Sequence, residues 1–242
     1  MLTKKLFGVI SLGCDKNRVD TEKLLGLLKD RGCKTTDDLS KAQIVVVNTC
    51  AFLQSAREEA IETILECADY KKGKLEKIVV TGCLPQKFID ELFLPLNEAD
   101  VFLGISDYEK IFEALEASYQ NDARQNYVGK GQDGYSLSRV LTTDEHVAYL
   151  KIADGCYNHC TYCLIPKIRG KYRSYPMEKL LDEADSLGDI SELILVAQDT
   201  TRYGEDIYGE NRFVQLIREL SKLENIQKIR LLYCYPTLLG KN

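Results

Sequence analysis

Short apolar runs alternate with amphipathic stretches along the first 120 residues of the chain. The apolar runs, all rich in β-branched residues, are Leu6–Leu12, Ile44–Asn48, Ile78–Thr81 and Val101–Ile105. The amphipathic stretches between them are Asp20–Arg31, Ala56–Tyr70, Gln86–Phe93 and Tyr108–Ala117. Apolar runs of this length predict buried strands, and apolar positions at a helical period predict helices. Their alternation predicts an α/β domain over residues 1–120, in which an open parallel sheet is flanked by helices.

The second half of the chain shows the same alternation after a break. Residues 121–145 are polar, contain glycine and lack a sustained period, so they predict a linker with at most one short strand. From residue 146 the predicted strands are Val147–Ala153, Leu193–Ala197 and Ile229–Tyr233, and the predicted helices are Met177–Leu187 and Val214–Leu223. Three strands with two crossovers, followed by the end of the sequence, predict that residues 146–242 form the first half of a (β/α) barrel.

Composition and charge narrow the class of protein. The chain has 242 residues, 45% hydrophobic and 29% charged, which is ordinary for a soluble globular protein. No apolar run approaches the ~20 residues that span a bilayer. Leu6–Leu12 follows two lysines like a short leader, but charged residues come directly after it, which favours a first strand and a cytoplasmic protein. The net charge of −5 disfavours stable binding of nucleic acid.

Cysteine is the unusual component, with nine residues and no favoured leader, so metal or redox chemistry is expected. Cys156, Cys160 and Cys163 form a CxxxCxxC motif directly after a predicted strand. Three thiolates this close can hold one metal centre. A structural zinc ion needs a fourth ligand, for which His159 in the same turn is a candidate, whereas a four-iron cluster accepts three cysteines and leaves one iron open. The spacing favours the redox cluster over zinc.

The first domain carries another three cysteines, Cys14, Cys50 and Cys83. They come first along the chain and form the first trio, and the CxxxCxxC cysteines form the second trio. Each cysteine of the first trio follows a predicted parallel strand, and ligand sites in such sheets lie beyond the carboxyl ends of the strands. We therefore expect the three thiols at one edge, with Gly13 and Gly82 allowing tight turns before two of them. The alternative is three buried structural cysteines. Packing is also the better account of the remaining cysteines, Cys33, Cys67 and Cys234.

Polar residues near the motifs carry weaker signals. Gln198, Asp199 and Thr200 end a predicted barrel strand, where barrel active sites lie, and are expected to contact a cofactor; helix capping is the alternative for Asp199 and Thr200. Asn17 and Asp20 are expected to order the Cys14 loop. A basic run after the CxxxCxxC motif could hold an acidic group or form a solvated loop; its members are Lys167, Arg169, Lys171 and Arg173.

With both cysteine trios in view, the chain resembles the radical-SAM methylthiotransferase family over all 242 residues. In that family a first domain carries three separated cysteines and a second domain begins with CxxxCxxC. The chain is most similar to the branch that modifies an aspartate of a small-subunit ribosomal protein. The stretches that carry this likeness are SLGCDKNRVDTE at 11–22, YLKI at 149–152, IPKIRG at 165–170, LVAQDTTRYG at 195–204 and IRLLYCYP at 229–236.

The resemblance implies two [4Fe-4S] clusters and S-adenosylmethionine. The cluster on the CxxxCxxC motif would bind S-adenosylmethionine through its open iron and, when reduced, cleave it to a 5′-deoxyadenosyl radical. The cluster on the other trio would carry sulfur, methylated by a second S-adenosylmethionine. Tyr162 would lie beside the adenine. The implied cluster ligands are Cys14, Cys50, Cys83, Cys156, Cys160 and Cys163.

The implied reaction adds a methylthio group to the β-carbon of the target aspartate. The implied partners are the ribosomal protein and an external electron donor of the flavodoxin or ferredoxin type. The acidic pI of about 5.3 suits a basic ribosomal protein better than tRNA. Two alternatives stay open: a tRNA adenosine methylthiotransferase, and a catalytically inactive iron–sulfur-binding fragment. The second is kept because the family continues through further barrel strands and a small TRAM β-domain, which this sequence does not contain.

Overall fold

The chain divides into two compact units, Met1–Val140 and Leu141–Asn242. The computed structural model describes residues 2–129, 138–144 and 146–235, and each unit is described here by itself. Parts of the predicted linker, residues 130–137 and 145, lie outside the described residues, as do residues 236–242 at the end of the predicted barrel segment.

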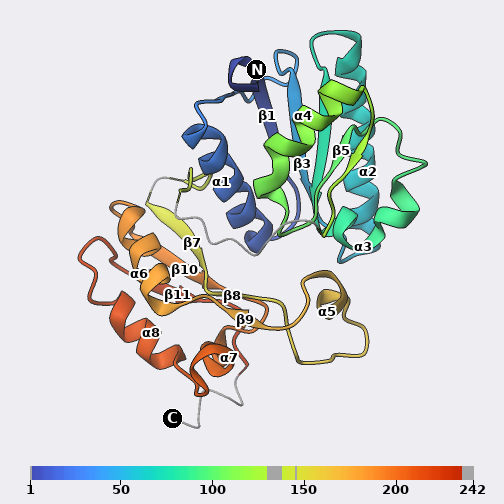
Figure 1. Cartoon of the computed structure of the whole chain (residues 1–242). Helices are drawn as coiled ribbons and strands as arrows, with labels where there is room; N and C mark the ends of the chain where they lie inside the picture. Colours follow the sequence, from blue (N-terminus) through green and yellow to red (C-terminus); the bar gives the residue numbers. More distant parts are fainter. Residues whose placement is uncertain (1, 130–137, 145, 236–242) are drawn as a thin grey trace. The chain divides into compact units, whose positions relative to one another are not determined.

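The first unit is built on a six-stranded parallel sheet (Figure 1). The strand order is β2-β1-β3-β4-β5-β6. The strands are β1 Leu6–Ser11, β2 Lys34–Thr35, β3 Ile44–Thr49, β4 Lys77–Gly82, β5 Val101–Phe102 and β6 Gln125–Asn126. The helices are α1 Asp15–Asp30, α2 Gln54–Asp69, α3 Cys83–Leu92 and α4 Ile111–Asn121, with short 3-10 turns at Leu2–Lys4, Tyr70–Lys72 and Tyr108–Lys110.

Two hydrophobic cores, one on each face of this sheet, explain why the strands are almost wholly apolar. In β3, Ile44 and Val46 belong to the core that includes residues of α1 and α4. Val45 and Val47 belong to the core on the other face, which includes residues of α2 and against which Ile89 of α3 packs. Because successive side chains of a strand point to opposite faces, a strand covered on both sides needs apolar residues at every position. The predicted parallel sheet flanked by helices is confirmed.

Element boundaries differ from the sequence prediction where polar residues are buried. Helix α1 begins at Asp15, five residues before the predicted start at Asp20. Its first turn buries Lys16 and Asn17, so the inward face lacks the apolar period that marks a helix. The two-residue strand β2 has exposed polar residues and gave no signal in the sequence. Strand β6 lies within the predicted linker, where one short strand was allowed, and pairs with β5.

The second unit contains a three-stranded parallel sheet of order β11-β10-β7. Its strands are β7 Val147–Lys151, β10 Glu192–Val196 and β11 Ile229–Leu231; β8 Ala153–Asp154 pairs antiparallel with β9 Arg173–Ser174. The helices are α5 Ile165–Ile168, α6 Met177–Ser186, α7 Glu205–Tyr208 and α8 Phe213–Leu220, with a 3-10 turn at Thr200–Arg202. Helices α6 and α8 pack against each other (Figure 1). The three predicted strands and two crossover helices are confirmed; the β8–β9 pair, α5 and α7 were not predicted.

In the part of the chain that the structure describes, none of the helices has the length and apolar character needed to cross a membrane.

Candidate metal centres

The first cysteine trio lies at the carboxyl edge of the six-stranded sheet. Cys14 follows β1 and is the N-cap residue of α1, and Cys83 is the first residue of α3, directly after β4. Cys50 directly follows β3, which lies between β1 and β4 in the sheet. Three adjacent parallel strands therefore end in a cysteine loop on the same edge. Cys83 is buried, while Cys14 and Cys50 are partly exposed.

Glycines before two of these cysteines let the loops approach each other closely. Gly13 has φ of +90° and Gly82 has φ of +96°, a region that side chains rarely allow. A Cβ atom on Gly13 would lie 2.6 Å from the Cβ of Cys50 and 3.1 Å from its Sγ. The Cys14 loop thus packs directly on Cys50. The prediction that these glycines permit tight turns is confirmed.

The second trio lies in the loop between β8 and α5. The backbone N–H of Cys156 donates to the carbonyl of Gly170 at 3.2 Å, and the N–H of Cys163 donates to the carbonyl of Cys160 at 3.0 Å. The N–H of Asn158 donates to Sγ of Cys156 at 3.4 Å. All three cysteines are partly exposed. Burial raises the pKa of the Cys156 thiol, and the negative charge of Asp199 raises it further.

A buried cluster of charges anchors the start of this loop. The Asp154 carboxylate pairs with Nζ of Lys151 and with the guanidinium of Arg169, both at 3.0 Å, and accepts from the N–H of Gly155 at 2.9 Å. Burial opposes ionisation of Asp154, but these two cations outweigh it and hold its pKa well below its usual range. Arg169 is therefore neither part of a solvated loop nor exposed. The other three members of the basic run are exposed: Lys167, Lys171 and Arg173.

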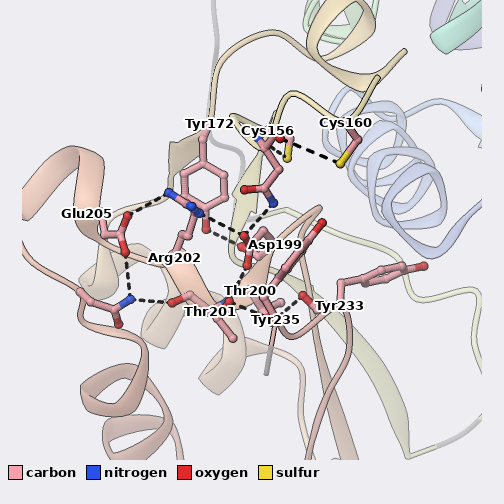
Figure 2. Close-up of polar contacts among 12 residues, drawn as sticks. Cys156, Cys160, Tyr172, Asp199, Thr200, Thr201, Arg202, Glu205, Tyr233 and Tyr235 are labelled. Carbon is pink, nitrogen blue, oxygen red and sulfur yellow. Dashed lines mark hydrogen bonds and ion pairs between the residues drawn. The ribbon is translucent and has the colours of Figure 1, made fainter. Parts of the chain in front are cut away.

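Asp199 connects the same loop to the end of β10 (Figure 2). Its buried carboxylate accepts from Nδ2 of Asn158 at 3.0 Å and from the N–H of Thr201 at 3.2 Å, and it forms an ion pair with Nε of Arg202 at 3.2 Å. The contact with Thr201 caps the 3-10 turn that follows, so the capping role offered as the alternative for Asp199 is present. The contact with Asn158, inside the CxxxCxxC motif, adds a second role, which is to hold the loop.

Two tyrosines that the sequence did not point to complete the surroundings of Asp199. The Tyr172 hydroxyl donates to the Asp199 backbone carbonyl at 2.8 Å. Burial and the negative charge of Asp199 raise the pKa of Tyr172, so this hydroxyl stays protonated. Tyr235 lies beside the loop, where desolvation and the nearby thiol of Cys160 raise its pKa (Figure 2). The Tyr-Cys-Tyr stretch that contains Tyr235 was the available signal, since it follows a predicted barrel strand.

The remaining predicted cofactor residues differ in environment. The amide atoms of Gln198, Nε2 and Oε1, are both buried and have no hydrogen-bond partner among the described residues. Thr200 is buried, and its hydroxyl donates to the carbonyl of Leu232 at 2.9 Å. Tyr162 is 81% exposed. Of the predicted cofactor residues, Gln198 is therefore the one with buried polar atoms that could still accept or donate a hydrogen bond.

The donor chemistry of both trios fits iron–sulfur ligation. Each trio supplies three thiols from neighbouring loop positions, and three cysteines are a complete protein ligand set for a four-iron cluster with one open iron. A closed zinc site requires a fourth side chain. Within residues 2–129, 138–144 and 146–235, the side chains form no group of three or more His, Cys, Asp or Glu at metal-holding distances.

Two of the three cysteines outside the trios, Cys67 and Cys33, lie in or against a hydrophobic core. Cys67 is 2% exposed and belongs to one hydrophobic core, and burial raises the pKa of its thiol to about 11. Cys33 packs against the other core. Cys234 lies 3.3 Å from the hydroxyl of Thr200. The prediction of packing is confirmed for Cys67 and Cys33.

A family model and a solved structure are both similar to this chain. Residues 6–104 match the uncharacterized protein family UPF0004. The fold is similar to that of the cobalamin-dependent S-adenosylmethionine radical enzyme OxsB, with a TM-score of 0.50 and 12% identity over 90% of this chain and 37% of that chain. A likeness at that identity concerns the fold alone.

Particular relatives then identify the branch. The chain is 47% identical over 238 residues to the ribosomal protein uS12 methylthiotransferase RimO of Clostridium tetani, covering 97% of this chain and 53% of that protein. It is 48% identical over 233 residues to the RimO protein of Lachnoclostridium phytofermentans, covering 94% and 52%. The chain is RimO-like in sequence, and it spans about half the length of the curated relatives it matches.

Proposed function

We propose that the complete protein adds a methylthio group to the β-carbon of an aspartate in ribosomal protein uS12, with S-adenosylmethionine as both methyl donor and radical source. The observation that carries this proposal is identity of 46–48% to uS12 methylthiotransferases across both units of the chain. Both thiol trios fall within the matched length. The names of these relatives favour a protein substrate over tRNA adenosine.

The division of the chain into functional parts follows the same proposal. Residues 1–120 form the methylthiotransferase domain, residues 121–145 the linker, and residues 146–242 the first half of a radical-SAM partial barrel. The parallel order of β7, β10 and β11 supports the barrel segment, as does the likeness in fold to a radical enzyme. The CxxxCxxC loop follows the first of these strands, at the carboxyl end where barrel active sites lie.

Two [4Fe-4S] clusters, when bound, would supply one-electron cleavage of S-adenosylmethionine at the second trio and sulfur transfer at the first. The residues of the chain hold and orient these centres. Cys14, Cys50 and Cys83 would ligate one cluster, and the CxxxCxxC thiols the other. The buried pair of Asp154 with Arg169 joins the residues before and after the second loop, and Asp199 holds Asn158 within it. Both contacts favour a single geometry of the three thiols.

The predicted contacts to S-adenosylmethionine rest on four residues: Tyr162, Gln198, Asp199 and Thr200. Gln198 is the strongest of them, because a buried amide without a partner gains most from a polar ligand group. Tyr162, with its ring largely exposed, is free to stack on the adenine. Asp199 and Thr200 are already hydrogen-bonded within the protein, so their contribution is to place Gln198 and the loop.

The proposed partners are uS12 and an electron donor of the flavodoxin or ferredoxin type, in the cytoplasm. The net charge of −5 favours a basic protein substrate and disfavours stable binding of nucleic acid.

Formation of 5′-deoxyadenosine tests the radical chemistry on this chain. We expect the anaerobically reconstituted and reduced chain to convert S-adenosylmethionine to 5′-deoxyadenosine and methionine, and Cys160→Ala to abolish both products. Mass spectrometry of uS12 and of tRNA, after incubation with the complete protein, then identifies the substrate. Methylthiolation of tRNA instead of uS12 would contradict the proposal, as would metal binding without cleavage of S-adenosylmethionine.

A further inference from the structure

We propose that Asn17 and Thr49 are positioning residues that set the spacing of Cys14, Cys50 and Cys83 before any metal binds. The inference deepens the proposed function and rests on it, because it concerns the trio assigned to sulfur transfer. The evidence is a buried hydrogen-bond network that links the three cysteine loops to one another.

Asn17 joins the first loop to the second. It is 0% exposed and lies in the first turn of α1, three residues after Cys14. Its Nδ2 donates to the carbonyl of Leu12 at 3.1 Å and to the carbonyl of Thr49 at 2.8 Å. Leu12 stands two residues before Cys14, and Thr49 stands directly before Cys50. Both N–H groups of one amide therefore donate to backbone carbonyls that stand shortly before two different cysteines.

Thr49 joins the second loop to the third. Its side chain is fully buried, and its hydroxyl donates to the carbonyl of Thr81 at 2.6 Å. The same oxygen accepts from the N–H of Leu84 at 3.3 Å. Thr81 and Leu84 flank Cys83 on either side. Asn17 also touches this third loop, since its Oδ1 lies 3.6 Å from Sγ of Cys83.

The chemistry of these two side chains explains why other residues would not serve. Only an amide offers two donors and an acceptor in one plane, so aspartate at position 17 would turn a carboxylate oxygen toward two carbonyls. Valine at position 49 would leave the Thr81 carbonyl and the Leu84 N–H without their partner in a buried site. The thiol contact of Asn17 requires a protonated Cys83. The hydrogen bonds that do not depend on a protonated Cys83 are therefore those donated by Nδ2 of Asn17 and those of the Thr49 hydroxyl.

The test uses the full chain with Cys156→Ala, Cys160→Ala and Cys163→Ala as the parent, so that bound metal reports the first trio. The metal-free readout is binding of arsenite, because trivalent arsenic takes three thiolate ligands. The second readout is iron and sulfide content after anaerobic reconstitution. The variants are Asn17→Asp and Thr49→Val, and Cys83→Ala defines the loss of one ligand.

Thr21→Val is the matched control. Thr21 is also buried on α1, and its hydroxyl can donate to Oγ of Ser11 at 2.8 Å or to the Asn17 carbonyl at 3.0 Å. It accepts from Nδ2 of Asn48 at 2.9 Å, and none of these partners is one of the residues through which Asn17 and Thr49 hold the cysteine loops. It therefore reports the cost of losing buried hydrogen bonds on the same helix. Urea unfolding of every variant confirms that it is folded under the assay conditions.

We expect Asn17→Asp and Thr49→Val to lower arsenite affinity at least tenfold and to lose most of the ~4 irons of the parent, while Thr21→Val keeps both. Unchanged arsenite binding in the two variants would overturn the inference, and so would an equal loss in Thr21→Val. Arsenite binding that depends on Asn17 in a parent that takes up no iron would support the positioning role and contradict the cluster. A parent that binds neither would overturn both.

Discussion

At the scale of single residues, Asp199 holds the CxxxCxxC loop through one side chain. Its carboxylate bonds Asn158 within the motif and Thr201 at the start of the next turn, and pairs with Arg202. A buried carboxylate with several donors around it is stable only while those donors stay in place. The loop and the turn after β10 are thus coupled through Asp199.

Asp199→Asn replaces an acceptor with a donor in this site. Because Asn158, Thr201 and Arg202 all present N–H groups, we expect a loss of about 1–3 kcal/mol in unfolding free energy. We also expect lower iron content at the second trio and unchanged content at the first. Urea unfolding measures the stability. Iron analysis measures each site separately, in one variant without the Cys14, Cys50 and Cys83 thiols and in another without the CxxxCxxC thiols. Glu205→Gln, which alters the partly exposed pair with Arg202 and keeps an amide oxygen for Nδ2 of Asn211, serves as the control.

Gly155→Ala tests the close packing of the same loop. Gly155 has φ of +70°, and a Cβ there would overlap the carbonyl of Lys171. Gly188 has φ of +77° with open space around its Cβ position. We expect Gly188→Ala to cost about 1–2 kcal/mol from backbone strain alone, and Gly155→Ala to cost clearly more. Equal thermal shifts in the two variants would show that the loop does not pack on residues 170–171.

At the scale of elements, helix α1 is fastened to the segment that follows the first sheet. Glu22 of α1 and Arg139 form an ion pair at 2.5 Å, with side chains 0% and 2% exposed. The N–H of Val140 donates to the carbonyl of Glu22 at 3.0 Å. Residues 138–140 lie in the predicted linker, yet they belong to the first unit and contact α1.

Removing one partner of this pair is expected to be costly. Arg139→Ala removes the guanidinium that pairs with the buried Glu22 carboxylate, so we expect a loss of about 3–5 kcal/mol in unfolding free energy. Lys72→Ala removes the exposed pair with Asp69, whose side chains are 83% and 74% exposed, and should cost far less. Denaturant unfolding compares the two. A cost for Arg139→Ala as small as the control would refute the role of this pair.

Glu76, directly before β4, forms a pH-sensitive contact at the amino-terminal ends of the strands in the first sheet. Burial opposes ionisation of Glu76, but hydrogen bonds from Lys5, Tyr119 and Gln43 outweigh it and lower its pKa. A carboxylate with a lowered folded-state pKa stabilises the fold above its unfolded value of ~4.3 and loses that contribution as pH falls through the folded value.

The difference in unfolding free energy between Glu76→Gln and the wild type should therefore shrink as the pH falls. We expect a constant difference between about pH 7 and pH 5, and a shrinking one below about pH 4.3. Thermal unfolding across this range measures it. Glu62→Gln on the exposed side of α2 is the control, for which the difference from wild type should stay small throughout. A difference for Glu76→Gln that grows in acid would contradict the assignment.

Elements marked by apolar periodicity were predictable, and those stabilised by buried polar groups were not. Strands β1, β3 and β4 and helix α2 follow the apolar pattern closely. The first turn of α1 was missed because Asn17 faces inward with polar partners. The role of residues 138–140 was missed because a buried ion pair and backbone contacts leave no periodic signal in a single sequence.

At the scale of the whole molecule, the sequence predicted which cysteines are candidate metal ligands but not which side chains hold their loops. The carboxyl ends of parallel strands determine where Cys14, Cys50 and Cys83 lie, and this follows from topology. The network through Asn17 and Thr49 depends on side-chain directions that topology does not specify. The role of Asn158 was likewise not predicted, although it stands inside the motif.

The central claim is that one chain holds two independent three-cysteine sites for iron–sulfur clusters. The most direct measurement is iron and sulfide per chain after anaerobic reconstitution of the wild type and of the Cys156→Ala, Cys160→Ala, Cys163→Ala variant. The account predicts about eight irons in the wild type and about four in the variant. About four or fewer irons in the wild type, unchanged in the variant, would contradict it, because the radical-SAM site would then not form in this chain.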